Sequence, residues 1–155
     1  MGKNLFMIKK ILIIFILSIQ TNAFALIEVD ITRGNLDPLP LAVSPLSIDD
    51  KSKKSFEKIL KKDNIGSEIS LIVENNLRTS GLFDPLNKDA FLQAPDIANL
   101  KPRFEDWNLI KAQALITGKV TYVDEKLRVE FRLWDILAAK EMMALAFTTV
   151  PSNWR

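Results

Sequence analysis

The last third of the chain alternates apolar and polar side chains with a period of two, and this pattern limits the possible folds more than any other feature. Between residues 126 and 134, four apolar positions alternate with charged ones. Such alternation predicts a β-strand with one covered face. Shorter alternating stretches at 114–122 and from Met143 to Phe147 predict a strand on either side of it. We therefore expect residues 114–149 to form an antiparallel meander.

The middle of the chain supplies helices that can cover this meander. Apolar side chains recur at helical spacing between Ile65 and Leu77, and Gly81 just beyond them is suited to a left-handed C-terminal cap. Weaker patterns predict a charged helix within 47–63 and a short helix over 103–112. Residues 87–102 contain two prolines and are expected to form a loop.

Two further extended segments complete the predicted fold. Leu39 to Val43 is a short apolar run that suits a strand buried on both faces, and Leu82 to Leu86 is extended. The element order predicts an α+β domain: a mixed sheet with an antiparallel C-terminal meander and two to three helices on one face. Trp107 is expected in the core. Trp134 is expected to be half-exposed, or covered by something beyond this chain, and Trp154 to find little cover.

Residues 1–25 have the pattern of a cleavable export signal. Three lysines precede an apolar run from Ile11 to Ile19, and Ala23-Phe24-Ala25 provides the small residues that signal peptidase reads. This apolar run is shorter than the roughly 20 residues of a membrane-spanning helix, which favours cleavage between Ala25 and Leu26 over an uncleaved anchor. We expect residues 26–155 to form one exported domain in a secreted or periplasmic setting.

Composition excludes several classes of function. The chain has no cysteine and no histidine, so disulfides, Ser-His-Asp triads, Cys-His pairs and the usual zinc sites are absent. Residues 1–25 hold three of the 21 basic residues and none of the 19 acidic ones. Residues 26–155 are therefore almost neutral, and the basic pI is no argument for nucleic-acid binding.

Four charged clusters could each form a known kind of site. Glu28 and Asp30 could act as paired carboxylates, Asp49-Asp50 could contact a cation, residues 128–132 could bind an anion, and the lysines of 51–62 could contact lipid headgroups. In each case a solvated or cross-strand-paired surface accounts better for the pattern. The sequence therefore predicts no catalytic residue, no metal site, no cofactor and no small-molecule substrate.

The segment from Leu26 to Thr32 is a predicted strand at the start of the mature chain. Its apolar side chains, Ile27, Val29 and Ile31, alternate with Glu28, Asp30 and Thr32, and the strand ends at Arg33-Gly34. A strand next to a free terminus can pair with its own sheet or with the sheet edge of another protein. Both possibilities remain open from the residues alone.

Five ordered segments resemble the N-terminal domain of the TolB family of the Tol-Pal system. Together they cover nearly all of the mature chain: residues 27–34, 77–86, 116–120, 129–135 and the closing Asn153-Trp154-Arg155. The resemblance implies an α+β fold similar to the anticodon-binding domains of some tRNA synthetases, without a nucleic-acid function.

In that family the extreme mature N-terminus engages the C-terminal domain of TolA. The resemblance therefore implies a partner-binding segment made of Leu26, Ile27, Glu28, Val29, Asp30, Ile31, Thr32, Arg33 and Gly34. It also implies a periplasmic, non-enzymatic role in outer-membrane integrity and cell division.

The sequence departs from the family after Arg155. TolB continues into another helix and then a β-propeller, which binds Pal, so Pal binding is not expected of this chain. Two alternatives stay open: a non-functional remnant of a split or truncated gene, and an unrelated periplasmic protein that binds a small ligand or uses carboxylates for catalysis.

Overall fold

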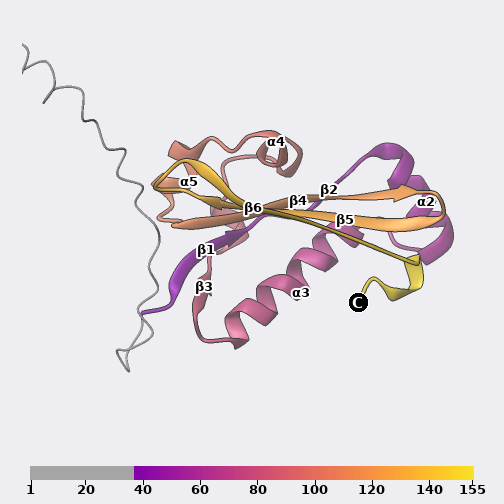
Figure 1. The fold of residues 1–155 in the computed structure, drawn as a ribbon, viewed down its shortest axis with the longest axis horizontal. Coiled ribbons are helices and arrows are strands. Elements are labelled where there is room, and N and C mark those ends of the chain that lie inside the picture. Colours follow the sequence, from indigo (N-terminus) through magenta and orange to yellow (C-terminus); the bar gives the residue numbers. More distant parts are fainter. Residues whose placement is uncertain (1–36) are drawn as a thin grey trace, which may run out of the picture.

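A mixed β-sheet forms the centre of residues 37–155, the part of the chain that the computed structural model describes (Figure 1). Its strands are β1 (Leu39–Val43), β2 (Ser47–Ile48), β3 (Phe83–Pro85), β4 (Ala114–Val123), β5 (Lys126–Asp135) and β6 (Lys140–Thr149). The helices are α2 (Asp50–Leu60), α3 (Ile65–Thr79), α4 (Pro95–Leu100) and α5 (Phe104–Leu109), with 3₁₀ turns η1 (Lys88–Ala90) and η2 (Pro151–Asn153).

The strands lie in the order β3-β1-β4-β5-β6, with the short β2 also beside β4. β1 pairs in parallel with β3 and β4, whereas β4, β5 and β6 pair antiparallel. One row across the sheet runs from Leu41 through Ala114 and Asp135 to Lys140. β1, β4 and β6 therefore all begin at the same end. The predicted mixed sheet and its C-terminal meander are confirmed.

Helices cover both faces of the sheet. Phe56 of α2 and Ile65 and Ile69 of α3 pack against Val120 and Leu127 on one face. Figure 1 shows α4 and α5 on the other side from α3. The core there consists of Ala42, Trp107, Ala112, Leu115, Trp134 and Ile136. The fold class and the pair of helices on one face agree with the expectation from the sequence. The helices α4 and α5 on the second face were not expected there.

α3 is the longest helix of residues 37–155 and agrees closely with its sequence pattern. Its buried side begins at Ile65 and Ile69. Its end is closed by backbone bonds in which the Ser80 N–H donates to the Asn76 carbonyl at 3.2 Å and the Gly81 N–H donates to the Arg78 carbonyl at 3.1 Å. Gly81 has φ +72°, a conformation in which glycine has no Cβ to clash. The predicted glycine cap is confirmed.

Trp134 is buried, so the expectation of a half-exposed side chain is wrong. Its indole N–H donates to the Thr117 hydroxyl at 2.8 Å, and its ring meets Phe104 of α5 edge to face, with centroids 6.0 Å apart. α5 of the same chain therefore covers the Trp134 side chain. Trp107 is a core residue, as predicted. Trp154 is partly buried against the α2–α3 core.

Residues 87–102 are more structured than a loop, because they contain η1 and α4. Pro95 stands at the start of α4, where a missing N–H costs nothing. Buried Gln93 holds this segment to α5. Its side-chain carbonyl accepts from the Trp107 indole N–H at 3.0 Å and from the Arg103 backbone N–H at 2.9 Å.

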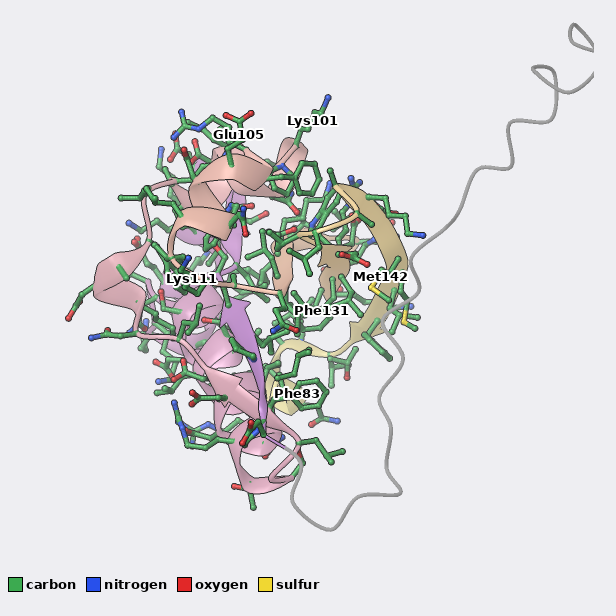
Figure 2. All side chains as sticks on the ribbon, turned by 90° about the vertical axis from the view of Figure 1, so that its left-hand side faces the viewer. Phe83, Lys101, Glu105, Lys111, Phe131 and Met142 are labelled. Carbon is green, nitrogen blue, oxygen red and sulfur yellow. The ribbon has the colours of Figure 1, made fainter. Side chains whose placement is uncertain are left out.

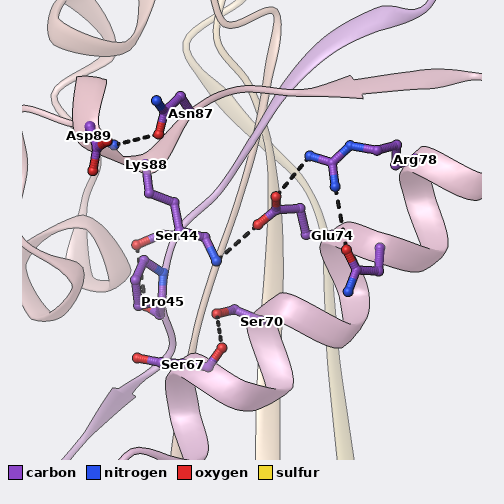
Figure 3. Close-up of polar contacts among 10 residues, drawn as sticks. Ser44, Pro45, Ser67, Ser70, Glu74, Arg78, Asn87, Lys88 and Asp89 are labelled. Atoms are coloured by element: carbon purple, nitrogen blue, oxygen red, sulfur yellow. Dashed lines mark hydrogen bonds and ion pairs between the residues drawn. The ribbon is translucent and has the colours of Figure 1, made fainter.

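An ion-pair network joins α3 to η1 (Figure 3). The Glu74 carboxylate lies 2.9 Å from the Arg78 guanidinium and 2.9 Å from the Lys88 ammonium. Burial acts to raise the pKa of Glu74, but the hydrogen bonds and charges of Lys88 and Arg78 outweigh it, and the pKa is held below its ordinary value. Folding therefore favours the ionised carboxylate.

We expect Glu74→Gln to lower the free energy of unfolding by about 1 kcal/mol at neutral pH, because two charge-assisted hydrogen bonds become neutral ones. A carboxyl whose folded pKa is depressed stabilises the protein above its unfolded value of about 4.5 and loses that contribution as the pH falls through the folded pKa. Urea unfolding from neutral into acidic pH should show the two curves converging. A constant difference across that range would contradict this assignment, and exposed Glu57→Gln is the control.

Candidate partner-binding surface

The predicted binding segment, Leu26 to Gly34, and the cleavage position at Ala25 lie outside the described residues. The described chain begins at Asp37 and enters β1 directly, where the Leu39 N–H donates to the Leu82 carbonyl at 2.9 Å. The predicted segment is therefore joined to the sheet at the end where β1, β4 and β6 all begin.

β6 is an edge strand without the usual protection. Among the described residues it pairs with β5 alone, and its positions from Glu141 to Thr148 are all exposed. No charged residue and no proline occurs between Met142 and Thr148. Natural edge strands commonly carry such residues, which discourage pairing with another chain. Figure 2 shows Met142 on this outer strand.

An apolar groove lies between α3 and the β5–β6 pair. It has a volume of about 240 Å³ and is lined by Val73, Ile116, Phe131, Arg132, Leu133, Met143 and Leu145. Phe147, the next side chain on this face of β6, meets Phe131 edge to face with centroids 6.3 Å apart. The inner side of the β6 edge is therefore apolar along most of its length.

The opposite side of the same edge is lined with arginine. Arg132 stands opposite Ala144, and Arg128 opposite Thr148. A hollow of about 190 Å³ is lined by Arg128, Glu130, Phe131, Arg132, Ala144, Leu145 and Ala146. Ala144, which stands opposite Arg132, and Ala146, which stands opposite Glu130, leave this hollow open toward the edge.

The charged row on β5 pairs internally, in agreement with the interpretation favoured from the sequence. Arg128 lies 2.9 Å from Glu130, and Lys119 of β4 lies 3.6 Å from the same carboxylate. The hydrogen bond from Arg128, assisted by Lys119, holds the pKa of Glu130 below its ordinary value. Arg132 lies 3.6 Å from Glu141 of β6.

Glu28 and Asp30 lie outside the described residues, whereas Asp49-Asp50 and the lysines of 51–62 belong to a helix cap and a solvated helix surface. Asp49 caps α2, since its carboxylate accepts from the Ser52 N–H at 2.9 Å and from the Ser52 hydroxyl at 2.7 Å. These hydrogen bonds lower the pKa of Asp49. Exposed lysines of 51–61 surround the helix that it caps. No group of three or more acidic, histidine or cysteine side chains within 37–155 could hold a metal ion.

No helix of the described region is long and apolar enough to cross a membrane.

The open β6 edge was not anticipated from the sequence as a functional surface. Its position at the end of the sheet depends on tertiary strand order, although the uncharged run from Met142 to Thr148 is a signal that sequence analysis can detect.

A family model described as the TolB amino-terminal domain matches residues 27–142. The chain belongs to this TolB amino-terminal domain family. The predicted strand beginning at Ile27 falls inside the matched range. A similar curated protein, the Tol-Pal system protein TolB of Pelagibacter ubique, is 77% identical over 149 residues, which are 96% of this chain and 33% of that protein. The chain thus spans about a third of its relative's length.

Solved structures share the fold at low sequence identity. TolB from Acinetobacter baumannii matches with a TM-score of 0.55 and 18% identity, over 77% of this chain and 25% of that one. Lipoprotein GNA1162 from Neisseria meningitidis matches with a TM-score of 0.52 and 16% identity, over 73% of this chain and 81% of that one. At these identities the likenesses show a shared fold alone.

Proposed function

We propose that this chain is a periplasmic partner-binding module of the Tol-Pal system, and that residues 26–34 bind the C-terminal domain of TolA by strand addition. It acts through protein contacts and performs no chemistry, in support of outer-membrane integrity and cell division. The observation that carries the proposal is the alternation of apolar and polar residues over 27–32, which falls within the match to the TolB amino-terminal domain.

Strand addition suits the composition of this segment. Main-chain hydrogen bonds supply affinity and alternate side chains supply specificity. Ile27, Val29 and Ile31 would face the apolar side of the acceptor sheet, with Glu28 and Asp30 on the other side. Within 37–155, where no metal-holding cluster occurs, the surface features are an open strand edge and an apolar groove, which are suited to binding protein.

Deleting Leu26 to Arg33 is expected to abolish capture of the chain by immobilised TolA C-terminal domain. The far-ultraviolet circular dichroism should change little, because the deletion ends before the described domain begins at Asp37. A point variant sharpens the test: Val29→Asp puts a charge on the apolar side and should weaken binding at least about a hundredfold, while Glu28→Gln on the other side should retain it. Undiminished binding by the deletion variant would defeat the proposal.

A further inference from the structure

We propose that β6 is the interface of a two-fold symmetric dimer, in which the β6 strands of two copies of this chain pair antiparallel and join their sheets into one. The inference goes beyond the proposed function, because it concerns a different surface from residues 26–34 and a different partner from TolA. In the described part of the chain β6 pairs with β5 alone. Its positions from Glu141 to Thr148 are all exposed.

The outer edge of β6 is open to a further strand. An edge strand presents unpaired main-chain N–H and C=O groups, and charged residues or prolines normally discourage another chain from using them. Residues 142–148 contain neither. The charges beside this stretch are already matched, since Arg128 lies 2.9 Å from Glu130 and Arg132 lies 3.6 Å from Glu141. Pairing along the edge therefore leaves these ion pairs as they are.

Side-chain size along β6 reads the same in both directions about Leu145. The order Met143-Ala144-Leu145-Ala146-Phe147 is large, small, large, small, large. A two-fold axis at Leu145 puts this residue opposite itself, Met143 opposite Phe147, and Ala144 opposite Ala146. A two-fold interface brings one patch against itself, so a pattern that is symmetric about its centre suits a second copy. A strand of another protein imposes no such symmetry on β6.

Shifted registers match less well. With the axis one residue earlier, Glu141 stands opposite Phe147. With the axis one residue later, Met143 stands opposite Thr149. Each shift replaces contacts between large apolar side chains, which are the pairs that stabilise neighbouring strands, by contacts with a polar one. The register centred on Leu145 is therefore the favoured one.

The same register covers the apolar groove beside α3. Met143 and Leu145 line this groove, and Phe147 meets Phe131 on the same side of the sheet. The two-fold axis is perpendicular to the sheet, so the apolar side of one copy continues into the apolar side of the other. Phe147 of the second copy then stands opposite Met143, at the border of the groove. Each copy thus shields the groove of the other from water.

The available surface is sufficient for a weak dimer. Met142, Met143, Leu145 and Phe147 are 45%, 50%, 49% and 56% exposed. Together with the main chain and the alanines of the edge, side chains of this size would bury on the order of 500 Å² per copy, or about 1,000 Å² in all. This area lies at the lower limit of a specific interface. We therefore expect a dimer that dissociates on dilution.

Sedimentation of the full chain, exported and purified, should show a monomer that dimerises with a dissociation constant on the order of 10–100 µM. Leu145→Lys places two like charges face to face on the axis and should raise this constant at least about tenfold. The matched control is Leu109→Lys on α5, at a position that is 71% exposed and away from the edge. It should dimerise like the unchanged chain, and circular dichroism should show both variants folded. A chain that stays monomeric at all concentrations, or equal constants for the two variants, would overturn the pairing.

Single cysteines test the register, because the chain has none of its own. Leu145→Cys meets itself across the axis within disulfide distance, so the reduced protein should form a linked dimer at least about tenfold faster than Leu109→Cys. Ala144→Cys lies about 8 Å from its own copy, beyond disulfide reach. It should link slowly alone and fast when mixed with Ala146→Cys chains. Fast linkage of Ala144→Cys to itself would refute the axis at Leu145. Neither measurement involves TolA, so their failure leaves the proposed function untouched.

Discussion

Trp107→Ala is expected to lower the free energy of unfolding by about 3–5 kcal/mol, the range observed when a large aromatic core side chain is truncated. Trp107 is 1% exposed and packs with Ala42, Leu115 and Trp134 between the sheet and α5. Its ring meets Phe91 edge to face with centroids 5.0 Å apart. Removing the indole therefore opens a cavity at the centre of the second face.

Part of the lost stability comes from a hydrogen bond. The Trp107 indole N–H donates to the Gln93 side-chain carbonyl, which also accepts from the Arg103 N–H. Trp107→Phe keeps most of the packing and leaves the Gln93 side-chain carbonyl oxygen one donor, the Arg103 N–H, so we expect a loss of about 1–2 kcal/mol. The difference between the two variants separates the cavity from the hydrogen bond.

Urea unfolding followed by circular dichroism measures both effects, and Leu109→Ala on the same helix is the control. Leu109 is 71% exposed, so its truncation should change the free energy of unfolding by less than about 0.5 kcal/mol. A domain of this size has a stability of roughly 5–15 kcal/mol. If Trp107→Ala were as stable as Leu109→Ala, the packing of α5 on the sheet would be refuted.

Local periodicity explains why the meander and α3 could be predicted. Val129, Phe131 and Leu133 alternate with charged neighbours, and each strand of the meander follows the last through a short turn. α3 carries its own apolar stripe and its own cap at Gly81. Such elements need little information from distant residues.

The cover on the second face of the sheet could have been deduced from β1. Leu41, Ala42 and Val43 are all buried, and successive strand residues point to opposite faces. A strand predicted to be buried on both faces requires cover on both, which conflicts with helices on one face alone. The short α5 and the proline-containing α4 have weak helical signals, and their position depends on tertiary contacts such as those of Gln93.

One part of the candidate surface could be predicted from the sequence and another part could not. The alternation of Ile27, Val29 and Ile31 is visible in the sequence. The groove beside β6 is not, because Val73 comes from α3 while Ile116 and Met143 come from different strands. Only the strand order shows that β6 lies at an edge.

Gly118→Ala is expected to be as damaging as the loss of Trp107, for the opposite reason: it adds an atom where none fits. Gly118 lies on β4 opposite Phe131 of β5. A Cβ at this position would overlap the Glu130 backbone carbonyl oxygen and would reach 3.0 Å from the Leu46 side chain. Backbone in the middle of a paired sheet cannot move aside, so the β4–β5 ladder itself must distort.

We expect a loss of about 3 kcal/mol or more, at the upper end of overpacking effects. Gly81→Ala is the matched control: it has open space around it and a positive φ of +72°, so its cost of about 1 kcal/mol is conformational. Chemical denaturation gives the free energy of unfolding of both variants. Because both are glycine-to-alanine changes, the comparison separates the cost of steric overlap at Gly118 from the cost of backbone strain at Gly81. Equal losses of stability would show that β4 and β5 are not packed as closely as in the structure. A much larger loss at Gly118 is expected because these two strands approach each other closely there. The same pairing places β6 beside β5, at the edge of the sheet.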